Sequence, residues 1–203
     1  MAVHPTAIVE PAVQIGRRTA VWDNVHIRHS TRIGDDCVIG EKSYVSYGVA
    51  ISDRVKINAF VCICTGVTIE RGVLIGAGTV FTNDRFPRAT TPDLRRLLPS
   101  GSDENTLQTR VREGATIGAQ CTIGSGLTIG RFAMVGMGSV VTRDVPDFIL
   151  ATGNPARAVG YVCACGLPLV PGAHELQSGP LEVMCRSCSA RYAIDERVVT
   201  RSA

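Results

Sequence analysis

The sequence predicts an all-β chain, a parallel β-helix built from hexapeptide repeats, on three observations. Large aliphatic residues recur at every sixth position, and turn-forming residues follow many of them. Apolar residues make up 45% of the chain but aromatic residues only 5%, so small and β-branched side chains must fill the core, and these favour strands. An amphipathic helix would need apolar spacings of three and four, which this repeat lacks.

The repeat starts at Val3, runs unbroken to Phe81, and resumes in the same phase from Val111 to Val141. Each anchor is expected to end a short strand, with a tight turn after it and three strands to a coil, which gives about six or seven coils. Two residues before each anchor a second inward position holds a small or branched side chain. Cys37 and Cys121 occupy this position and should be buried. The anchors are Val3, Val9, Ile15, Val21, Ile27, Ile33, Ile39, Val45, Ile51, Ile57, Ile63, Ile69, Ile75, Phe81, Val111, Ile117, Ile123, Ile129, Val135 and Val141.

The interruption, residues 83–107, is expected to leave the coils as a loop. Long ordered loops in compact domains are usually functional, although a solvated arm is the alternative. Arg85, Arg88, Arg95 and Arg96 offer guanidinium groups to a phosphate or a carboxylate. Residues eighteen apart stack in such a coil, so one column of polar residues is expected to lead to the loop, and it consists of His29, Tyr47, Thr65 and Asn83.

Composition excludes several classes of function. The net charge of +3 is spread along the chain without a basic run, so nucleic acid is not expected as a partner. No basic segment precedes an apolar stretch at the N-terminus, and no eighteen consecutive residues are apolar. We therefore expect a cytoplasmic protein without membrane insertion, whose eight cysteines are thiols or metal ligands rather than disulfides.

The repeat dominates residues 1–160, and residues 161–203 are predicted to be a separate module. Cys163 and Cys165 form one close pair, and Cys185 and Cys188 form another, in the arrangement of a four-cysteine zinc ribbon. The first pair is one residue shorter than the usual knuckle, so unbound thiols and disulfides remain alternatives. A tail this short has too little apolar content to fold alone, which favours a structural Zn²⁺.

Two motifs carry a resemblance to a known family, "VFTNDRFPRA" and "TRDVPDFILATGNPARAVGYVCACG". With them, nearly the whole chain resembles the hexapeptide-repeat N-acetyltransferases that act on the 3-amino group of nucleotide-linked amino sugars. The enzymes for UDP-linked 2-acetamido-3-amino-2,3-dideoxyglucuronate look most similar. The resemblance implies a left-handed β-helix, a homotrimer, acetyl-CoA in a groove between neighbouring prisms and a nucleotide sugar that enters from the opposite end.

The resemblance also implies roles for individual residues. Asn83 matches the motif asparagine beside the acceptor amine, and the early segment "VWDNVHI" places His26 within the pattern. Substrate contacts are expected from Asn83, Arg85, Arg88, His29, Tyr47 and Asn58. Coenzyme contacts are expected from Gly118, Gly124, Gly136, Arg143, Asn154, Pro155 and Arg157, although Asn154 and Pro155 also suit a turn that simply ends the solenoid. Cys62 and Cys64 depart from the family pattern where the acceptor sugar would be read.

The histidine census bears on the chemistry, because no histidine lies between residues 30 and 173. Many O-acyltransferases need a base to activate a hydroxyl, whereas a neutral amine is already a nucleophile and mainly needs positioning. We expect Asn83 to accept a hydrogen bond from the amine and the N–H groups of Gly118, Gly124 and Gly136 to stabilise the thioester oxyanion. His26 remains a candidate base.

The predicted function is acetyl-CoA-dependent N-acetylation of a nucleotide-linked 3-amino sugar, for a surface polysaccharide or another glycoconjugate. The alternatives are an O-acetyltransferase of a small hydroxylated acceptor and a non-catalytic β-helix scaffold. A scaffold would give no reason for the loop at Asn83.

Overall fold

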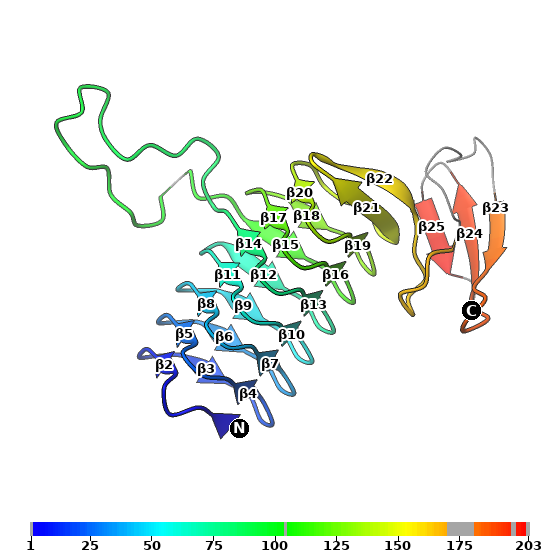
Figure 1. Cartoon of the computed structure of the whole chain (residues 1–203), viewed down its shortest axis with the longest axis horizontal. Coiled ribbons are helices and arrows are strands. Elements are labelled where there is room, and N and C mark those ends of the chain that lie inside the picture. The colour runs from blue at the N-terminus through cyan, green and yellow to red at the C-terminus, as the bar shows by residue number, and fades with distance from the viewer. Residues whose placement is uncertain (1, 104, 170–180, 196–197, 202–203) are drawn as a thin grey trace.

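Short parallel strands stack into a solenoid along most of the chain (Figure 1). The computed structural model describes residues 2–103, 105–169, 181–195 and 198–201, and none of these residues lies in a helix. The parallel β-solenoid agrees with the β-helix that the hexapeptide period predicts. None of the described segments offers a helix of the length and apolarity that crossing a bilayer requires.

Three parallel sheets form the sides of the solenoid, and successive strands along the chain pass from one sheet to the next. Sheet 1 contains β1 (Ala2–Val3), β4 (Ala20–Val21), β7 (Val38–Ile39), β10 (Lys56–Ile57), β13 (Leu74–Ile75), β16 (Thr116–Ile117), β19 (Met134–Val135), β21 (Ile149–Gly153) and the antiparallel β22 (Ala156–Tyr161). Sheet 2 contains β2 (Ile8–Val9), β5 (His26–Ile27), β8 (Tyr44–Val45), β11 (Cys62–Ile63), β14 (Val80–Phe81), β17 (Thr122–Ile123) and β20 (Val140–Val141). Sheet 3 contains β3 (Gln14–Ile15), β6 (Arg32–Ile33), β9 (Ala50–Ile51), β12 (Val67–Ile69), β15 (Thr109–Val111) and β18 (Thr128–Ile129).

Strand register shows how the loop is inserted. Ala20 pairs with Val38, eighteen positions later, as three hexapeptides per coil require. Phe81 pairs with Ile123, forty-two positions later, so the chain between β14 and β15 adds twenty-four residues to one coil without shifting its register. Figure 1 shows this segment projecting from the side of the solenoid.

The anchor residues form the core. Ile27, Ile63 and Ile117 are fully buried, as the period predicts, whereas Val9 in the first coil is 38% exposed because no coil covers its outer side. Cys37 and Cys121 are buried, which confirms that expectation. Their thiols donate to backbone carbonyls, Cys37 to Ser52 at 3.1 Å and Cys121 to Gly136 at 3.2 Å.

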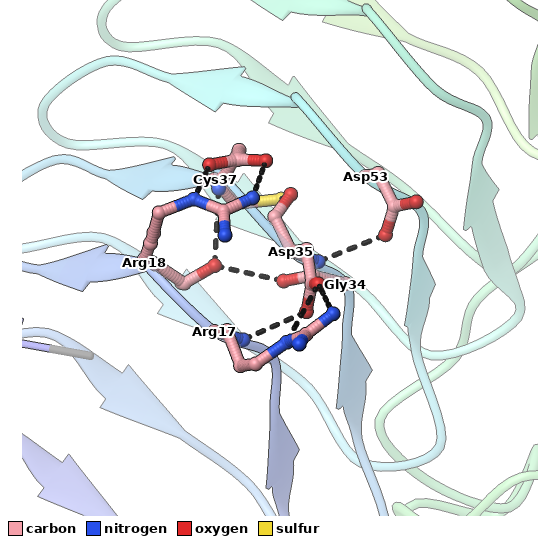
Figure 2. A network of polar contacts seen from close by, with 8 residues as sticks. Arg17, Arg18, Gly34, Asp35, Cys37 and Asp53 are labelled. Carbon is pink, nitrogen blue, oxygen red and sulfur yellow. Dashed lines mark hydrogen bonds and ion pairs between the residues drawn. The ribbon is translucent and has the colours of Figure 1, made fainter.

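The corner between sheets 3 and 1 is held by ionic contacts from coil to coil (Figure 2). The Arg17 N–H donates to Asp35 Oδ1 at 2.7 Å, and the Asp35 N–H donates to Asp53 Oδ1 at 2.8 Å. Farther along the same corner, the N–H of Arg131 donates to Asp147 Oδ1 at 2.7 Å. Carboxylates of a neighbouring coil thus satisfy turn N–H groups that would otherwise face solvent.

The C-terminal segment packs on the last coil. β23 (Leu181–Met184), β24 (Arg191–Asp195) and β25 (Val198–Arg201) form an antiparallel sheet, drawn beyond β22 in Figure 1. The rings of Phe148 and Tyr192 pack edge to face with their centroids 5.6 Å apart, and the two residues belong to one continuous hydrophobic core. The C-terminal sheet therefore covers the open end of the solenoid. The division at residue 160 stays a prediction, and part of the predicted module lies outside the described residues.

Candidate active site

The chain between β14 and β15 encloses a cavity of about 460 Å³ beside the solenoid. Residues 83–88 form one wall and residues 98–101 contribute to the other. This volume lies within the range of about 300–1,000 Å³ that is usual for small-molecule sites. The cavity is therefore large enough for a sugar or a nucleotide.

Asn83 lies where the solenoid meets this cavity. The Leu107 N–H donates to the Asn83 carbonyl at 3.0 Å, and Asp84 pairs with Thr106, so the two limbs are joined at their base. The Asn83 side chain has no hydrogen-bond partner among the described residues, although it lines the cavity. Its amide is free to bind a ligand.

Arg85 and Arg88 line the same cavity, whereas Arg95 and Arg96 of the same loop do not. The guanidinium of Arg85 lies over the Phe86 ring at 5.6 Å, and Arg88 Nη1 donates to the Pro87 carbonyl at 3.1 Å. Neither guanidinium forms an ion pair with an acid among the residues described. Two cations are thus left for an anionic ligand.

Asp84 and Asp103 also line the cavity, and the sequence reasoning missed both. The sequence could have indicated Asp84, because it follows the motif asparagine directly, and adjacent residues at the start of a loop can line the same wall of a cavity. Nothing in the sequence pointed to Asp103. The cavity therefore presents both signs of charge, which suits a ligand that carries an amine and a phosphate.

The predicted polar column is present below Asn83, but its other three members, His29, Tyr47 and Thr65, do not line the cavity. His29 and Tyr47 stack with ring centroids 5.3 Å apart, and Thr65 Oγ1 donates to the Tyr47 carbonyl at 2.9 Å. The Tyr47 hydroxyl is instead engaged by Ser102 of the loop. His29 is exposed two coils farther from the cavity than Thr65. The expectation that Tyr47 and His29 touch the substrate is not supported in the single chain.

His26 is too far from Asn83 for the two residues to act on one amine in the same chain. Three strand steps separate β5 from β14, which amounts to about 14 Å at 4.7–4.9 Å per step. His26 Nε2 is also paired with Glu10 Oε1 at 2.9 Å. Within one protomer the His26 ring serves a contact between coils, and its catalytic role stays a prediction.

Arg28 Nε forms an ion pair with Glu10 Oε1 at 2.6 Å, and the His29 N–H donates to Glu10 Oε2 at 3.0 Å. Desolvation acts to raise the pKa of Glu10, but the hydrogen bonds from His29, Arg28 and His26 outweigh it and lower that pKa to about 2. The cluster is an ionic clamp on the first coils rather than a reactive centre.

Asn58 is not part of the cavity. It follows β10 in sheet 1, whereas Asn83 follows β14 in sheet 2, so the two residues lie at different corners of the solenoid. Asn58 therefore does not line the cavity of its own chain, and its role as a substrate contact stays a prediction. Cys62 and Cys64, in contrast, are half-buried on the sheet that carries Asn83.

The backbone N–H groups that were predicted to stabilise the oxyanion already donate hydrogen bonds within the solenoid. The N–H groups of Gly118, Gly124 and Gly136 donate to carbonyls of Val135, Val141 and Ala151 in the next coil, at 2.8, 2.9 and 2.8 Å. The predicted role of these N–H groups is therefore wrong. At Gly118 a Cβ would come within 2.5 Å of the Met137 nitrogen, so glycine is needed there for close approach of coils.

A glycine follows three successive strands of sheet 1, and the residue after each glycine, Ala77, Ala119 or Met137, has its N–H in a different situation. The N–H groups of Ala77, Ala119 and Met137 have no acceptor among the described residues, unlike those at the corner in Figure 2. Their side chains are small except for Met137, which is 82% exposed. This corner, between sheets 1 and 2, leaves a row of backbone donors open.

The remaining coenzyme candidates lie toward the C-terminal end. Asn154 and Pro155 form the turn between β21 and β22, joined by a cis peptide bond. Arg157 pairs with Thr152, and the Thr152 methyl lies against Gly136. Arg143 is exposed after β20 in sheet 2. Arg157 and Gly136 therefore lie at the same edge of sheet 1 with β21 between them, whereas Arg143 occupies another corner.

The four C-terminal cysteines converge, with their sulfur atoms all within 4.8 Å of one another. Cys163 Sγ lies 3.4 Å from Cys188 Sγ, and Cys165 Sγ lies 3.6 Å from Cys185 Sγ. Tetrahedral zinc with Zn–S bonds of about 2.3 Å holds its sulfurs about 3.8 Å apart. Backbone hydrogen bonds from Cys188 and Ser187 lower the pKa of Cys185 to about 6. The donor set fits a zinc ion.

Comparison with known proteins identifies the family. The dTDP-3-amino-3,6-dideoxy-α-D-galactopyranose 3-N-acetyltransferase of Aneurinibacillus thermoaerophilus is 41% identical over 199 residues, which cover 98% of this chain and 94% of the relative. This chain belongs to the hexapeptide-repeat N-acetyltransferase family. The family model "Bacterial transferase hexapeptide (six repeats)" matches residues 12–46, and "Hexapeptide repeat of succinyl-transferase" matches residues 30–63 and 108–143. The cavity-forming loop lies between the last two matches.

Solved structures show that this acetyltransferase shares its fold with more distant proteins. WeeI from Acinetobacter baumannii AYE superposes with a TM-score of 0.51 at 24% identity, over 78% of this chain and 58% of that one. The product of the BC4754 gene of Bacillus cereus gives a TM-score of 0.50 at 19% identity, over 80% and 78%. At these identities the likeness concerns the solenoid alone.

Proposed function

We propose that this chain transfers the acetyl group of acetyl-CoA to the 3-amino group of a nucleotide-linked amino sugar. The observation that carries the proposal is the Asn83 amide, which has no partner in the described part of the chain, at the solenoid edge of a cavity that also presents Arg85 and Arg88. The name of the 41% identical relative describes the same type of reaction on a dTDP-linked sugar. This name supports the acceptor class, a nucleotide-linked 3-amino sugar.

Positioning and charge account for the chemistry. The two guanidinium groups bind the diphosphate, and Asn83 Oδ1 accepts a hydrogen bond from the amine, which turns its lone pair toward the thioester. Acetyl-CoA supplies the activated acyl group. The amine nitrogen attacks the carbonyl carbon, the C–S bond breaks, and the ammonium proton passes to the departing thiolate or to water. No histidine lies in residues 30–173, so the reaction must proceed without an imidazole from those coils.

We propose the corner between sheets 1 and 2 as the coenzyme surface. The free N–H groups of Ala77, Ala119 and Met137 can donate to the amide carbonyls of a pantetheine arm, and Arg157 can contact a phosphate. A homotrimer would place this corner of one prism near the cavity of its neighbour. Eight thiols, none of them in a disulfide among the described residues, support a reducing, cytoplasmic setting.

We further propose that Cys163, Cys165, Cys185 and Cys188 hold one structural Zn²⁺. All four thiolates would be needed for a closed tetrahedral site, so the ion would take no part in catalysis. The Tyr192 hydroxyl contacts Cys163 Sγ at 3.1 Å, and the Tyr192 ring packs on Phe148 of the last coil. The ion would thus fasten the C-terminal sheet to the end of the solenoid.

A panel of UDP- and dTDP-linked 3-amino and 4-amino sugars, with the matching hydroxyl sugars and acetyl-CoA, tests the proposal. Thiol release that requires a 3-amino sugar is expected, with an acetamide in the product by mass spectrometry. Release with the hydroxyl sugars alone would favour an O-acetyltransferase. Absence of release with every acceptor would favour a scaffold.

A further inference from the structure

Beyond its base, the returning limb of the loop contacts the solenoid at Tyr47, fifty-five positions before Ser102 in the chain. The Ser102 N–H donates to the Tyr47 hydroxyl at 2.8 Å, and Ser102 Oγ lies 2.9 Å from the same oxygen. A phenol can accept the first hydrogen bond and take part in the second at the same time. Both interactions involve one loop residue and one solenoid residue.

Tyr47 itself is held in place by the column below the cavity. Its ring lies parallel to the His29 ring, with an interplanar angle of 6°, and its carbonyl accepts from Thr65 Oγ1 at 2.9 Å. Tyr47 lies in the turn directly after β8, and β8 pairs with β5 on one side and β11 on the other. Its hydroxyl therefore offers a rigid attachment point for a loop that otherwise meets the solenoid at its base.

The attachment lies directly behind one wall of the cavity. Ser100, Gly101 and Asp103 line the cavity on either side of Ser102, whereas Tyr47 does not line it. The other wall, with Arg85 and Arg88, continues from β14. The distance between the two walls is thus set at the base by the Asn83 and Leu107 backbone and, farther out, by the Tyr47 hydroxyl.

We propose that Tyr47 is a positioning residue that anchors the returning limb through Ser102 and so holds the acceptor cavity at the width its sugar nucleotide needs. This inference deepens the proposed function and rests on it for the identity of the ligand. The anchor itself is a property of the free protein, so it can be tested without any substrate.

Limited trypsin digestion of the full-length protein tests the anchor. The loop contains Arg85, Arg88, Arg95 and Arg96 as cleavage sites. Tyr47→Phe removes the hydroxyl but keeps the ring on His29, and we expect loop cleavage to accelerate about tenfold, as loss of two hydrogen bonds would allow. Ser102→Ala keeps the backbone donor and should give a smaller increase.

Tyr44→Phe is the matched control, since the Tyr44 hydroxyl accepts from Arg28 at 3.1 Å and touches no loop residue. Equal cleavage rates for Tyr47→Phe, Tyr44→Phe and the wild-type protein would overturn the anchor. Melting temperatures of the three proteins should agree closely, because neither hydroxyl belongs to the core.

Kinetics with the acceptor identified in the sugar panel test the consequence. For Tyr47→Phe we expect KM for the nucleotide sugar to rise about tenfold while kcat and KM for acetyl-CoA stay near wild type. A fall in kcat with an unchanged KM would overturn the positioning role. If no acceptor is turned over by any variant, the proposed function fails, while the digestion result still decides the anchor.

Discussion

His26 Nε2 lies 2.9 Å from Glu10 Oε1, and the same carboxylate binds Arg28 and the His29 N–H. Glu10 belongs to the turn after β2 and His26 to β5, the next strand of sheet 2. The contact therefore joins the first coil to the second, near the end where anchor residues are only partly covered. An imidazole that looks like a base in sequence is here a structural ligand of a carboxylate.

We expect His26→Gln to change kcat by less than about threefold, since general bases usually contribute at least a hundredfold. Glutamine can keep a hydrogen bond to Glu10, so the fold should be retained. Steady-state kinetics with the preferred amino sugar provide the measurement. A hundredfold loss of kcat with an unchanged melting temperature would mean that His26 reaches an active site after all, for example that of a neighbouring chain.

The Glu10 cluster also predicts a pH dependence of stability. The pKa of Glu10 is about 2 in the folded chain against an ordinary value of 4.5, so folding favours its ionised form. That stabilisation is complete above about pH 5 and is lost as the pH falls from 4.5 toward 2. Wild type should melt higher than Glu10→Gln near pH 7, and the difference should shrink by pH 3. A constant difference across this range would contradict the assignment.

Asn83→Ala should lower kcat/KM for the amino sugar by about a hundredfold, because the amine loses the group that orients it. The melting temperature should change little, since the side chain has no partner among the described residues. Asn83→Asp keeps an oxygen acceptor in the same place and should retain more activity than the alanine variant. Parallel losses of activity and stability in both variants would point to a structural asparagine.

Arg88→Ala should raise KM for the nucleotide sugar by about tenfold or more, because a charge-assisted contact to phosphate is lost. Arg95→Ala is the matched control, because Arg95 is in the same loop but does not line the cavity. Calorimetric titration with the free nucleoside diphosphate measures its Kd for each variant, and the Kd should rise for Arg88→Ala but not for Arg95→Ala. Equal effects of the two substitutions would place the phosphate elsewhere.

Purified protein should contain about one zinc per chain by metal analysis. Removal of the ion with a strong chelator should lower the melting temperature by several degrees, because metal binding contributes to folding of the C-terminal sheet. Cys185→Ser should abolish zinc binding, whereas Cys62→Ser should retain the full zinc content. Tyr192→Phe should lose zinc to a competing chelator more readily, because its hydroxyl contacts Cys163. A metal content far below one per chain would reject the site.

The six-residue period and the eighteen-residue stacking rule predicted much of the fold and part of the candidate site. The six-residue period placed Ile63 and Cys37 in the core and Asn83 at the end of a column because the coil geometry repeats without variation. The same rule could have found the Glu10 cluster, since Arg28 follows Glu10 by eighteen residues. Asn58 was expected from the family resemblance instead, because a period of six does not tell which of the three sides faces a ligand.

By itself the sequence determined the solenoid, its buried anchors, the family and the cysteines of the C-terminal segment, because each follows from a regular spacing or a local motif. Only the tertiary structure decided which backbone donors remain free, that Gly118 serves coil contact, and that Tyr47 faces Ser102. Those facts depend on how a loop without any period folds back on the coils. Contacts between residues so far apart in the chain produce no periodic pattern, so the sequence alone does not predict them.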